Sequence, residues 1–218
     1  DANDIVVEKL RSDDHLYHMS PYTHSYPHDW RSKTPVIFRS TEQWFVGVDS
    51  DLGGGKTLRS MALAETENNI NFIPPWGQNR MRGMLESRPD WCLSRQRSWG
   101  LPIPAFVKSD GSYLLTPEIV RVIAKVFAEH GSDSWFAQPP EVLLAKWENP
   151  ENIDLSTLEK MHDIFDVWFE SGSSWNAVMQ ERDQGYPIDL YLEGSDQHRG
   201  WFQLSMLPAL ATTGTSPF

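Results

Sequence analysis

The sequence predicts an α/β fold in which parallel strands alternate with helices. Near the C-terminus, the apolar run 188–192 stops at a Glu-Gly pair, and Asp196 then precedes a helix-like segment, which is the order strand, tight turn, helix. Two earlier segments, 36–38 and 43–46, are rich in β-branched and aromatic residues and indicate further strands. In an open parallel sheet, nucleotides bind in the crevice beyond such strand ends. The turn after the run 188–192 is therefore a candidate binding site.

Two helices and one strand are predicted in the second quarter of the chain. The glycines at 53–55 favour a flexible turn before a helix over 56–68. A P-loop is the alternative, but that motif needs a glycine where Ser50 stands. A second helix over 77–87 and a strand over 90–96 follow. The apolar face of the second helix is expected to hold Met81, Met84 and Leu85.

The segment 116–131 has the features of a complete helix. Thr116 is a capping residue, Pro117 stands at the first helical position, and Gly131 suits the C-terminal cap. Its apolar face consists of Ile119, Ile123, Val126 and Phe127. A second, shorter helix is expected over 140–147.

The last quarter of the chain is predicted to return to strand and helix. Residues 166–172 are predicted as a strand that ends in a turn, and a closing helix is predicted over 196–211. The inward side of this helix is expected to hold Trp201, Leu204 and Leu207. Pro208 inside it is expected to kink the helix or to end it early.

Composition and charge exclude several classes of protein. No run approaches the roughly 20 apolar residues of a membrane span, and no signal peptide is visible. A single cysteine, Cys92, excludes an internal disulfide and fits a reducing cytoplasm. The net charge of −11 argues against strong nucleic-acid binding by this chain alone, because phosphate contacts need clustered lysines and arginines.

Four segments have distinctive amino-acid sequences. They are HSYPHDWRSKTPVIFRSTEQWFV (24–46), RPDWCLSRQRSWGLPIP (88–104), DVWFESG (166–172) and LYLEGSDQHRGWF (190–202). Together and in this order they resemble the isoleucyl-tRNA synthetases, a family of class I aminoacyl-tRNA synthetases. The second stretch is similar in style to valyl- and leucyl-tRNA synthetases as well, whereas GSDQHRGWF is much more particular to the isoleucine enzymes.

The resemblance implies four parts. They are the tail of the inserted editing domain (1–35), the return into the catalytic domain with its strand over 90–96 (36–102), a small helical insertion (103–163), and the second half of the Rossmann-like catalytic domain (164–218). The family's two signature motifs, His-Ile-Gly-His and Lys-Met-Ser-Lys-Ser, are absent. We therefore expect an internal fragment of a longer enzyme, with no catalytic residue and no proofreading activity of its own.

The resemblance also assigns two aromatic residues to substrate binding. Trp168 and Trp201 match the two tryptophans that wall the isoleucine side-chain pocket. Flat apolar rings suit this task because they exclude water around a branched aliphatic group. Considered without the family, Trp201 is an ordinary core residue.

The turn between the predicted strand and helix carries the remaining site residues. By resemblance, Glu193 matches the acid that contacts the adenylate, and Gly194 allows close approach of the backbone to the ligand. Asp196 and Gln197 match residues at the ribose and at the amino-acid end. The alternative for Asp196 is a simple helix cap. His198 is assigned no role.

The implied reaction uses isoleucine, ATP with Mg²⁺, and tRNA(Ile). Isoleucine is activated to isoleucyl-adenylate, and the acyl group then passes to the tRNA. The resemblance implies a monomeric cytoplasmic enzyme without membrane association. Some family members carry a zinc-binding Cys-x-x-Cys at the positions of 29–32, but both cysteines are absent here, so no zinc or other metal site is expected.

Alternatives remain for the arginines and for the function. The five arginines at positions 80, 82, 88, 95 and 97 form either an ordinary solvated surface or a patch near the tRNA acceptor end. The rival functions are a valyl- or leucyl-type synthetase and a non-catalytic scaffold. A Rossmann oxidoreductase is excluded because no Gly-x-Gly-x-x-Gly follows a strand.

Overall fold

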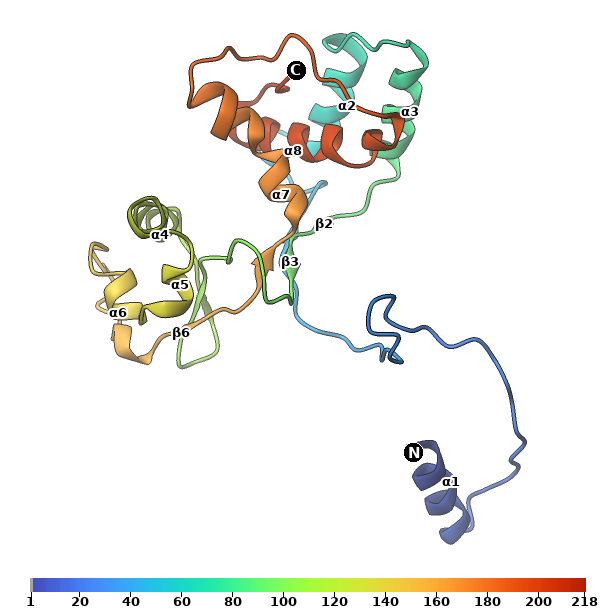
Figure 1. Cartoon of the computed structure of the whole chain (residues 1–218). Coiled ribbons are helices and arrows are strands. Elements are labelled where there is room, and N and C mark those ends of the chain that lie inside the picture. The colour runs from blue at the N-terminus through green and yellow to red at the C-terminus, as the bar shows by residue number, and fades with distance from the viewer. Residues whose placement is uncertain (1) are drawn as a thin grey trace. The chain divides into compact units, whose positions relative to one another are not determined.

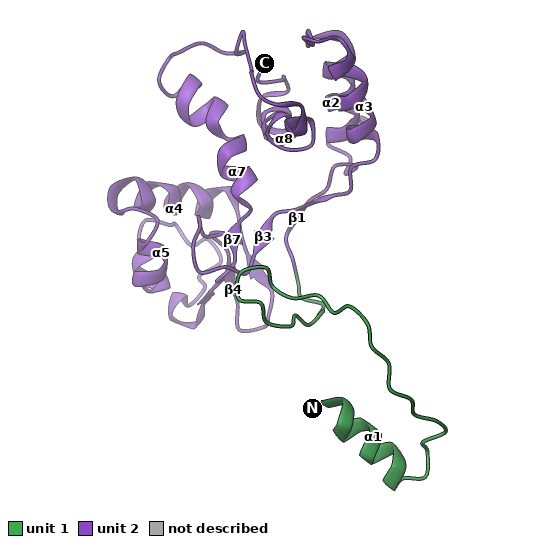
Figure 2. Ribbon diagram, turned by 45° about the vertical axis from the view of Figure 1, so that its right-hand side comes forward, with its two compact units in different colours: residues 1–42 green, residues 43–218 purple. Residues whose placement is uncertain are grey.

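The computed structural model describes residues 2–218 and divides the chain into two units, 1–42 and 43–218 (Figure 2). The first unit starts with helix α1 (Ala2–Ser12) and continues without further helix or strand (Figure 1). A turn forms where the Asp29 carboxylate accepts a hydrogen bond from the backbone N–H of Ser32 (2.6 Å). The strand predicted over 36–38 is wrong, because this segment has no partner strand among the described residues and strand propensity alone does not make a sheet.

The second unit contains all the other regular elements of the described chain. Its helices are α2 (Leu58–Asn68), α3 (Trp76–Glu86), α4 (Pro117–His130), α5 (Ser134–Ala137), α6 (Pro140–Leu143), α7 (Val167–Gly172) and α8 (Trp201–Thr213), with short helical turns η1 (Leu155–Thr157), η2 (Trp175–Gln180) and η3 (Ser195–His198). Its strands are β1 (Phe45–Val46), β2 (Trp91–Cys92), β3 (Ser94–Arg95), β4 (Phe106–Val107), β5 (Tyr113–Leu114), β6 (Glu159–Lys160) and β7 (Ile164–Phe165).

The strands are short and pair in antiparallel fashion. β1 pairs with β2, β3 pairs with β7, and β4 lies between β5 and β6. The mixture of helix and strand agrees with the predicted α/β class, but no parallel pair occurs in residues 2–218, so the predicted parallel arrangement is not found there. The segment predicted as a strand over 188–192 is a loop. Leu190 and Leu192 are 71% and 77% exposed, and no neighbouring strand of the described chain accepts or donates its hydrogen bonds.

Helices α2, α3 and α8 form the larger core of the second unit. Met81 and Leu85 of α3 pack with Ala62 of α2 and Leu207 of α8, all buried. The predictions of helices over 56–68 and 77–87 are therefore confirmed to within two residues at each end. Helix α2 begins with a capping box at Thr57. The Thr57 hydroxyl accepts a hydrogen bond from the backbone N–H of Ser60, and the Ser60 hydroxyl accepts one from the backbone N–H of Thr57.

Residues 167–172 form helix α7, with Asp166 as its N-cap, so the prediction of a strand over 166–172 is wrong. Trp168, Phe169 and Gly172 face the core. Gly172 follows the other two by four and three residues, and these intervals place residues on one face of a helix. Gly172 lies so close to α8 that a Cβ at this position would stand 2.0 Å from the carbonyl oxygen of Leu204. Figure 1 shows α7 crossing beside α8.

The closing helix differs from its prediction in two ways. The predicted segment 196–211 is split into η3 and α8, and α8 continues through Pro208 to Thr213. Proline has no N–H, so the carbonyl four residues earlier, that of Leu204, loses its helical partner. This is the same carbonyl that lies against Gly172, and the close approach of α7 occurs where the proline has freed it. Leu204 and Leu207 are buried as predicted, while Trp201 is half-buried.

A second core forms within residues 103–163. Trp135, Phe106 and Ile119 are completely buried there, and Trp135 packs at 5.0 Å from the Phe106 ring. The helix predicted over 116–131 is confirmed, with the Thr116 hydroxyl as its N-cap and Gly131 at a left-handed φ of 80°. The helix predicted over 140–147 is shorter, Pro140–Leu143.

Candidate substrate-binding site

The predicted turn joins the loop after residue 188 to η3 and α8. The backbone N–H of Gln197 donates to the carbonyl of Gly194 (3.0 Å), which closes the turn. Gly194 is exposed, and a Cβ there would lie 2.8 Å from an oxygen of Asp196. Asp196 does not cap α8, because that helix begins five residues later at Trp201 and its N-cap, Gly200, makes no side-chain cap bond.

One amide brings three of the predicted residues together. Gln197 Oε1 accepts a hydrogen bond from the backbone N–H of Trp201 (2.9 Å), and Gln197 Nε2 donates to Asp196 Oδ2 (3.0 Å). The ring of Trp168 approaches the same place from α7, since a Cβ on Gly200 would meet both the Trp168 ring (3.1 Å) and Gln197 Oε1 (2.6 Å). Because glycine has no side chain, Gly200 leaves space for the Trp168 ring and the Gln197 amide.

Trp201 is held on two sides. Its indole Nε1 donates to the carbonyl of Ser171 on α7 (2.9 Å), and its ring stacks on Tyr191 with a centroid distance of 3.8 Å. Tyr191 stacks in turn on Phe218 (4.4 Å) and donates its hydroxyl to Ser205 (2.8 Å). Burial raises the pKa of the Tyr191 hydroxyl, against the opposing effect of its bond to Ser205. Trp201 thus combines a packing role with its predicted place at the site.

Glu193 and Trp168 line different hollows. Glu193 is exposed and lines a hollow of about 570 Å³ between residues 69–77 and the loop 188–195. Trp168 lines a different hollow of about 460 Å³. Ser195 and His198 of η3 line the first hollow, and the next residue along the chain, Arg199, lines the second.

His198 occupies a buried position that the sequence did not predict. Its ring is buried between Phe72, parallel at 6.4 Å, and Phe202, edge-on at 5.4 Å. Its Nδ1 lies 2.7 Å from the Ser195 carbonyl, which only accepts, so Nδ1 carries the proton. Nε2 faces the first turn of α3, where a Cβ on Gly77 would lie 3.0 Å away. No local pattern signals this arrangement, because its partners come from a distant part of the chain.

The five arginines of the sequence do not form one patch. Arg82 pairs with Glu67 (3.3 Å) and Glu86 (3.1 Å) on the outer face of α3. Arg88 and Arg95 instead line the hollow of about 460 Å³ beside Trp168. This hollow also contains Arg199, which was not among the five.

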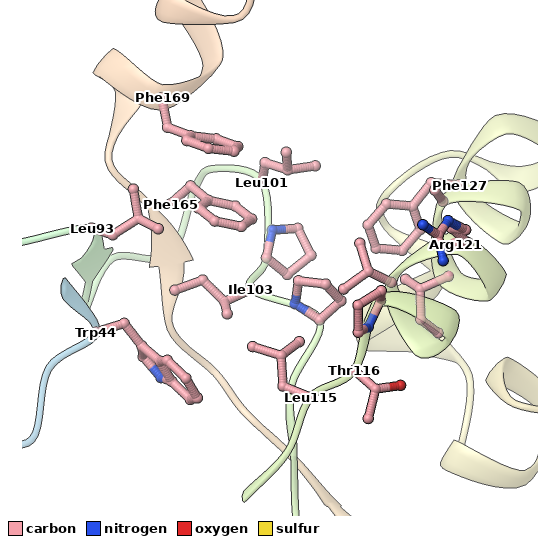
Figure 3. A pocket seen from close by; sticks show the side chains of 16 residues that line it. Trp44, Leu93, Leu101, Ile103, Leu115, Thr116, Arg121, Phe127, Phe165 and Phe169 are labelled. Carbon is pink, nitrogen blue, oxygen red and sulfur yellow. The ribbon is translucent and has the colours of Figure 1, made fainter. Parts of the chain in front are cut away.

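A third cavity, of about 620 Å³, lies between the β3–β7 pair and the start of α4 (Figure 3). Phe165 and Phe169 form one wall and Phe127 lies on the other, with the proline-rich segment 101–104 between them (Figure 3). Arg121 is its single charged lining residue. In the described chain, the lining of this cavity is otherwise almost entirely apolar and contains no carboxylate, histidine or lysine side chain.

Neither a metal-binding cluster nor a membrane-spanning helix occurs in residues 2–218. No group of three or more histidine, cysteine, aspartate or glutamate side chains in this range is arranged to hold a metal ion. No helix in the same range has the length and apolar character needed to cross a membrane.

Comparisons with known proteins agree with the resemblance. The family model for tRNA synthetases class I (I, L, M and V) matches residues 7–218. The chain is 47% identical over 219 residues to the isoleucine–tRNA ligase of Lactobacillus johnsonii, 47% over 221 residues to that of Campylobacter curvus and 48% over 220 residues to that of Kosmotoga olearia. Each match covers 100% of this chain, which spans about 23% of the length of these relatives. The chain belongs to the class I tRNA synthetases.

Proposed function

We propose that this chain supplies part of the isoleucine- and adenylate-binding site of an isoleucine–tRNA ligase. The junction at Gln197 carries the proposal, because one amide bonds both to the backbone of Trp201 and to the carboxylate of Asp196, and the ring of Trp168 lies on the same side of Gly200 as this amide. Residues of α7, η3 and α8 thereby come together around Gly200 and Gln197. The relatives named isoleucine–tRNA ligase favour isoleucine over valine or leucine as the amino acid.

The residues divide the task by their chemistry. Trp168 and Trp201 exclude water from the branched side chain of isoleucine. Gln197 and Asp196 offer amide and carboxylate oxygens to the ammonium and ribose hydroxyl groups, and Glu193 offers a second carboxylate on the other side of η3. None of these groups suits a phosphate, so they position the ligand and leave charge stabilisation to other parts of the enzyme.

The reaction then proceeds in two transfers. A carboxylate oxygen of isoleucine attacks the α-phosphorus of ATP, supplied with Mg²⁺, and the bond to pyrophosphate breaks. A ribose hydroxyl at the 3′ end of tRNA(Ile) next attacks the acyl carbon, and AMP leaves. A site that distinguishes isoleucine from valine by one methylene gains only about 1–3 kcal/mol, a general limit for which the isoleucine enzyme is itself the established example.

The remaining assignments rest on the family and on composition. We place residues 1–35 at the end of the editing domain and the enzyme in the cytoplasm as a monomer. The single cysteine fits a reducing compartment. The chain of 218 residues contains neither signature motif, so we expect no amino-acid activation by this chain alone.

Isoleucine-dependent exchange of pyrophosphate into ATP tests the proposal. We expect exchange by the whole enzyme that carries these residues, with isoleucine preferred to valine, and none by the 218-residue chain. Gln197→Leu in the whole enzyme removes both amide bonds and is expected to raise the KM for isoleucine about tenfold or more. An unchanged KM in this variant contradicts the role given to the amide.

A further inference from the structure

The hollow beside Trp168 carries more positive charge than the surrounding chain. Its charged lining residues are Arg88, Arg95, Arg199, Asp90 and Asp166. Three arginines therefore meet two aspartates in a protein whose net charge is −11. Such a concentration of guanidinium groups in a concave, partly desolvated place favours an anionic ligand.

Only one of the three arginines is neutralised by a direct ion pair within residues 2–218. Arg95 lies 3.2 Å from the buried carboxylate of Asp166, which also accepts a hydrogen bond from the indole of Trp91 (2.9 Å). The side chain of Arg199 is exposed and has no hydrogen bond or ion pair in the described chain. Arg88 makes no ion pair in the same range. Two guanidinium groups thus remain available to a ligand.

The guanidinium group of Arg88 is held in place, but its charge has no ion-pair partner within residues 2–218. Its Nη1 donates to Gln203 Oε1 (2.9 Å), while Gln203 Nε2 donates to the His198 carbonyl (2.7 Å), so a fully buried amide fixes the guanidinium from the first turn of α8. Arg59 holds the same residue from the other side by donating to its backbone carbonyl (2.7 Å). Burial lowers the pKa of Arg88, against the attraction of Asp166.

The remaining donors of Arg88 point to a missing acceptor. Nε is buried and has no hydrogen-bond partner among the described residues. Nη2 has no hydrogen-bond partner there either. A buried cation whose one partner is a neutral amide is costly, and an oxyanion in the hollow offsets that cost.

We propose that this hollow is a binding site for a phosphate group, held by Arg88 and Arg199 with Arg95 behind them. The inference rests on the proposed function for its two sources, which are the phosphodiester of the single-stranded 3′ end of tRNA and free pyrophosphate. Trp168 lines the same hollow and gives a nucleotide a ring on which to stack. The same ring lies beside Gly200, next to the junction at Gln197.

Arginine substitutions in the whole enzyme test the proposal. Arg199→Gln removes an exposed side chain without disturbing the core, and Arg88→Gln removes the fixed one. Arg80→Gln is the matched control, because Arg80 is an exposed arginine of α3 outside the hollow. Thermal unfolding verifies that each variant is folded, and Arg88→Lys, which keeps a charge, is expected to restore part of the loss.

The binding of tRNA(Ile), measured over a range of salt concentrations, identifies the first source. If the 3′ end binds here, Arg199→Gln and Arg88→Gln each weaken binding about tenfold and reduce the slope of log K against log salt by about 0.7. Arg80→Gln changes neither quantity. A tRNA without its three 3′-terminal nucleotides then binds the parent protein and the two hollow variants equally.

The pyrophosphate exchange reaction identifies the second source. If free pyrophosphate binds here, tRNA affinity is unchanged in both variants and the KM for pyrophosphate rises about tenfold. The proposal is overturned if neither quantity changes, if Arg80→Gln loses as much as Arg199→Gln, or if the loss persists with the shortened tRNA. Absence of isoleucine-dependent exchange in the parent protein refutes the proposed function instead, whereas tRNA binding needs no amino-acid activation and still reports on the hollow.

Discussion

Adding one methyl group at Gly172 tests how closely α7 is set against α8. The new Cβ of Gly172→Ala would lie 2.0 Å from the carbonyl oxygen of Leu204 and 2.7 Å from its carbonyl carbon. Carbon–oxygen contacts normally stay beyond about 3.3 Å, so the two helices must separate by about 1 Å. Overpacking of this kind costs about 1–3 kcal/mol, and the better helix propensity of alanine returns up to about 1 kcal/mol. Because a contact of 2.0 Å belongs at the severe end of that range, about 2–3 kcal/mol, we expect a net loss of about 1–2 kcal/mol in the free energy of unfolding.

A second glycine in a helix provides the matched control. Gly83 lies in α3, is exposed, and has no atom within 4 Å of the position of a Cβ. Gly83→Ala is therefore expected to stabilise the protein by up to about 1 kcal/mol. Urea unfolding, followed by far-ultraviolet circular dichroism, measures both variants. A Gly172→Ala protein that is as stable as the parent, or more stable, refutes the close approach of the two helices.

Three further predictions concern single contacts. Trp201→Phe keeps the stacked ring but loses the bond to the Ser171 carbonyl, so the free energy of unfolding should fall by about 0.5–1.5 kcal/mol; unchanged stability in urea denies that bond a role. Asp166→Asn replaces a buried carboxylate that holds an indole and a guanidinium, and a loss of about 1.5–3 kcal/mol is expected in the same assay. The bidentate bond from Arg59 lowers the pKa of Asp49 below its ordinary value of 3.8, so this pair stabilises the fold above about pH 4 and stops doing so as the pH falls through the lowered pKa. Asp49→Asn should abolish that part of the acid dependence of Tm, and an identical pH profile in the variant argues against it.

Local signals in the sequence predicted the helices well. The caps at Thr116 and Gly131 and the apolar spacing of α3 act within one turn, and the structure has the corresponding helices. Strands were predicted less well because they depend on partners. The apolar segments 36–38 and 188–192 have strand-like composition but no neighbouring strand in the described chain, and α7 was missed because its inward residues were taken for a strand.

The same distinction applies to the site. The sequence of the turn predicted that Asp196, Gln197 and Trp201 lie near one another. Their hydrogen bonds join residues only one and four positions apart. The support of this turn is not local. The burial of His198 and the fixing of Arg88 by Gln203 depend on the packing of α3 against η3 and α8, which no spacing in the sequence reveals.

The KM for isoleucine in a tryptophan variant tests the proposed pocket most directly. Trp168→Leu in the whole enzyme removes the ring that lies beside Gly200 at the Gln197 junction, while Trp99→Leu removes an indole that is 89% exposed and serves as the control. We expect Trp168→Leu to raise the KM for isoleucine about tenfold or more in pyrophosphate exchange, with the KM for ATP unchanged, and Trp99→Leu to alter neither. An isoleucine KM that stays the same in a folded Trp168→Leu enzyme contradicts the proposed pocket.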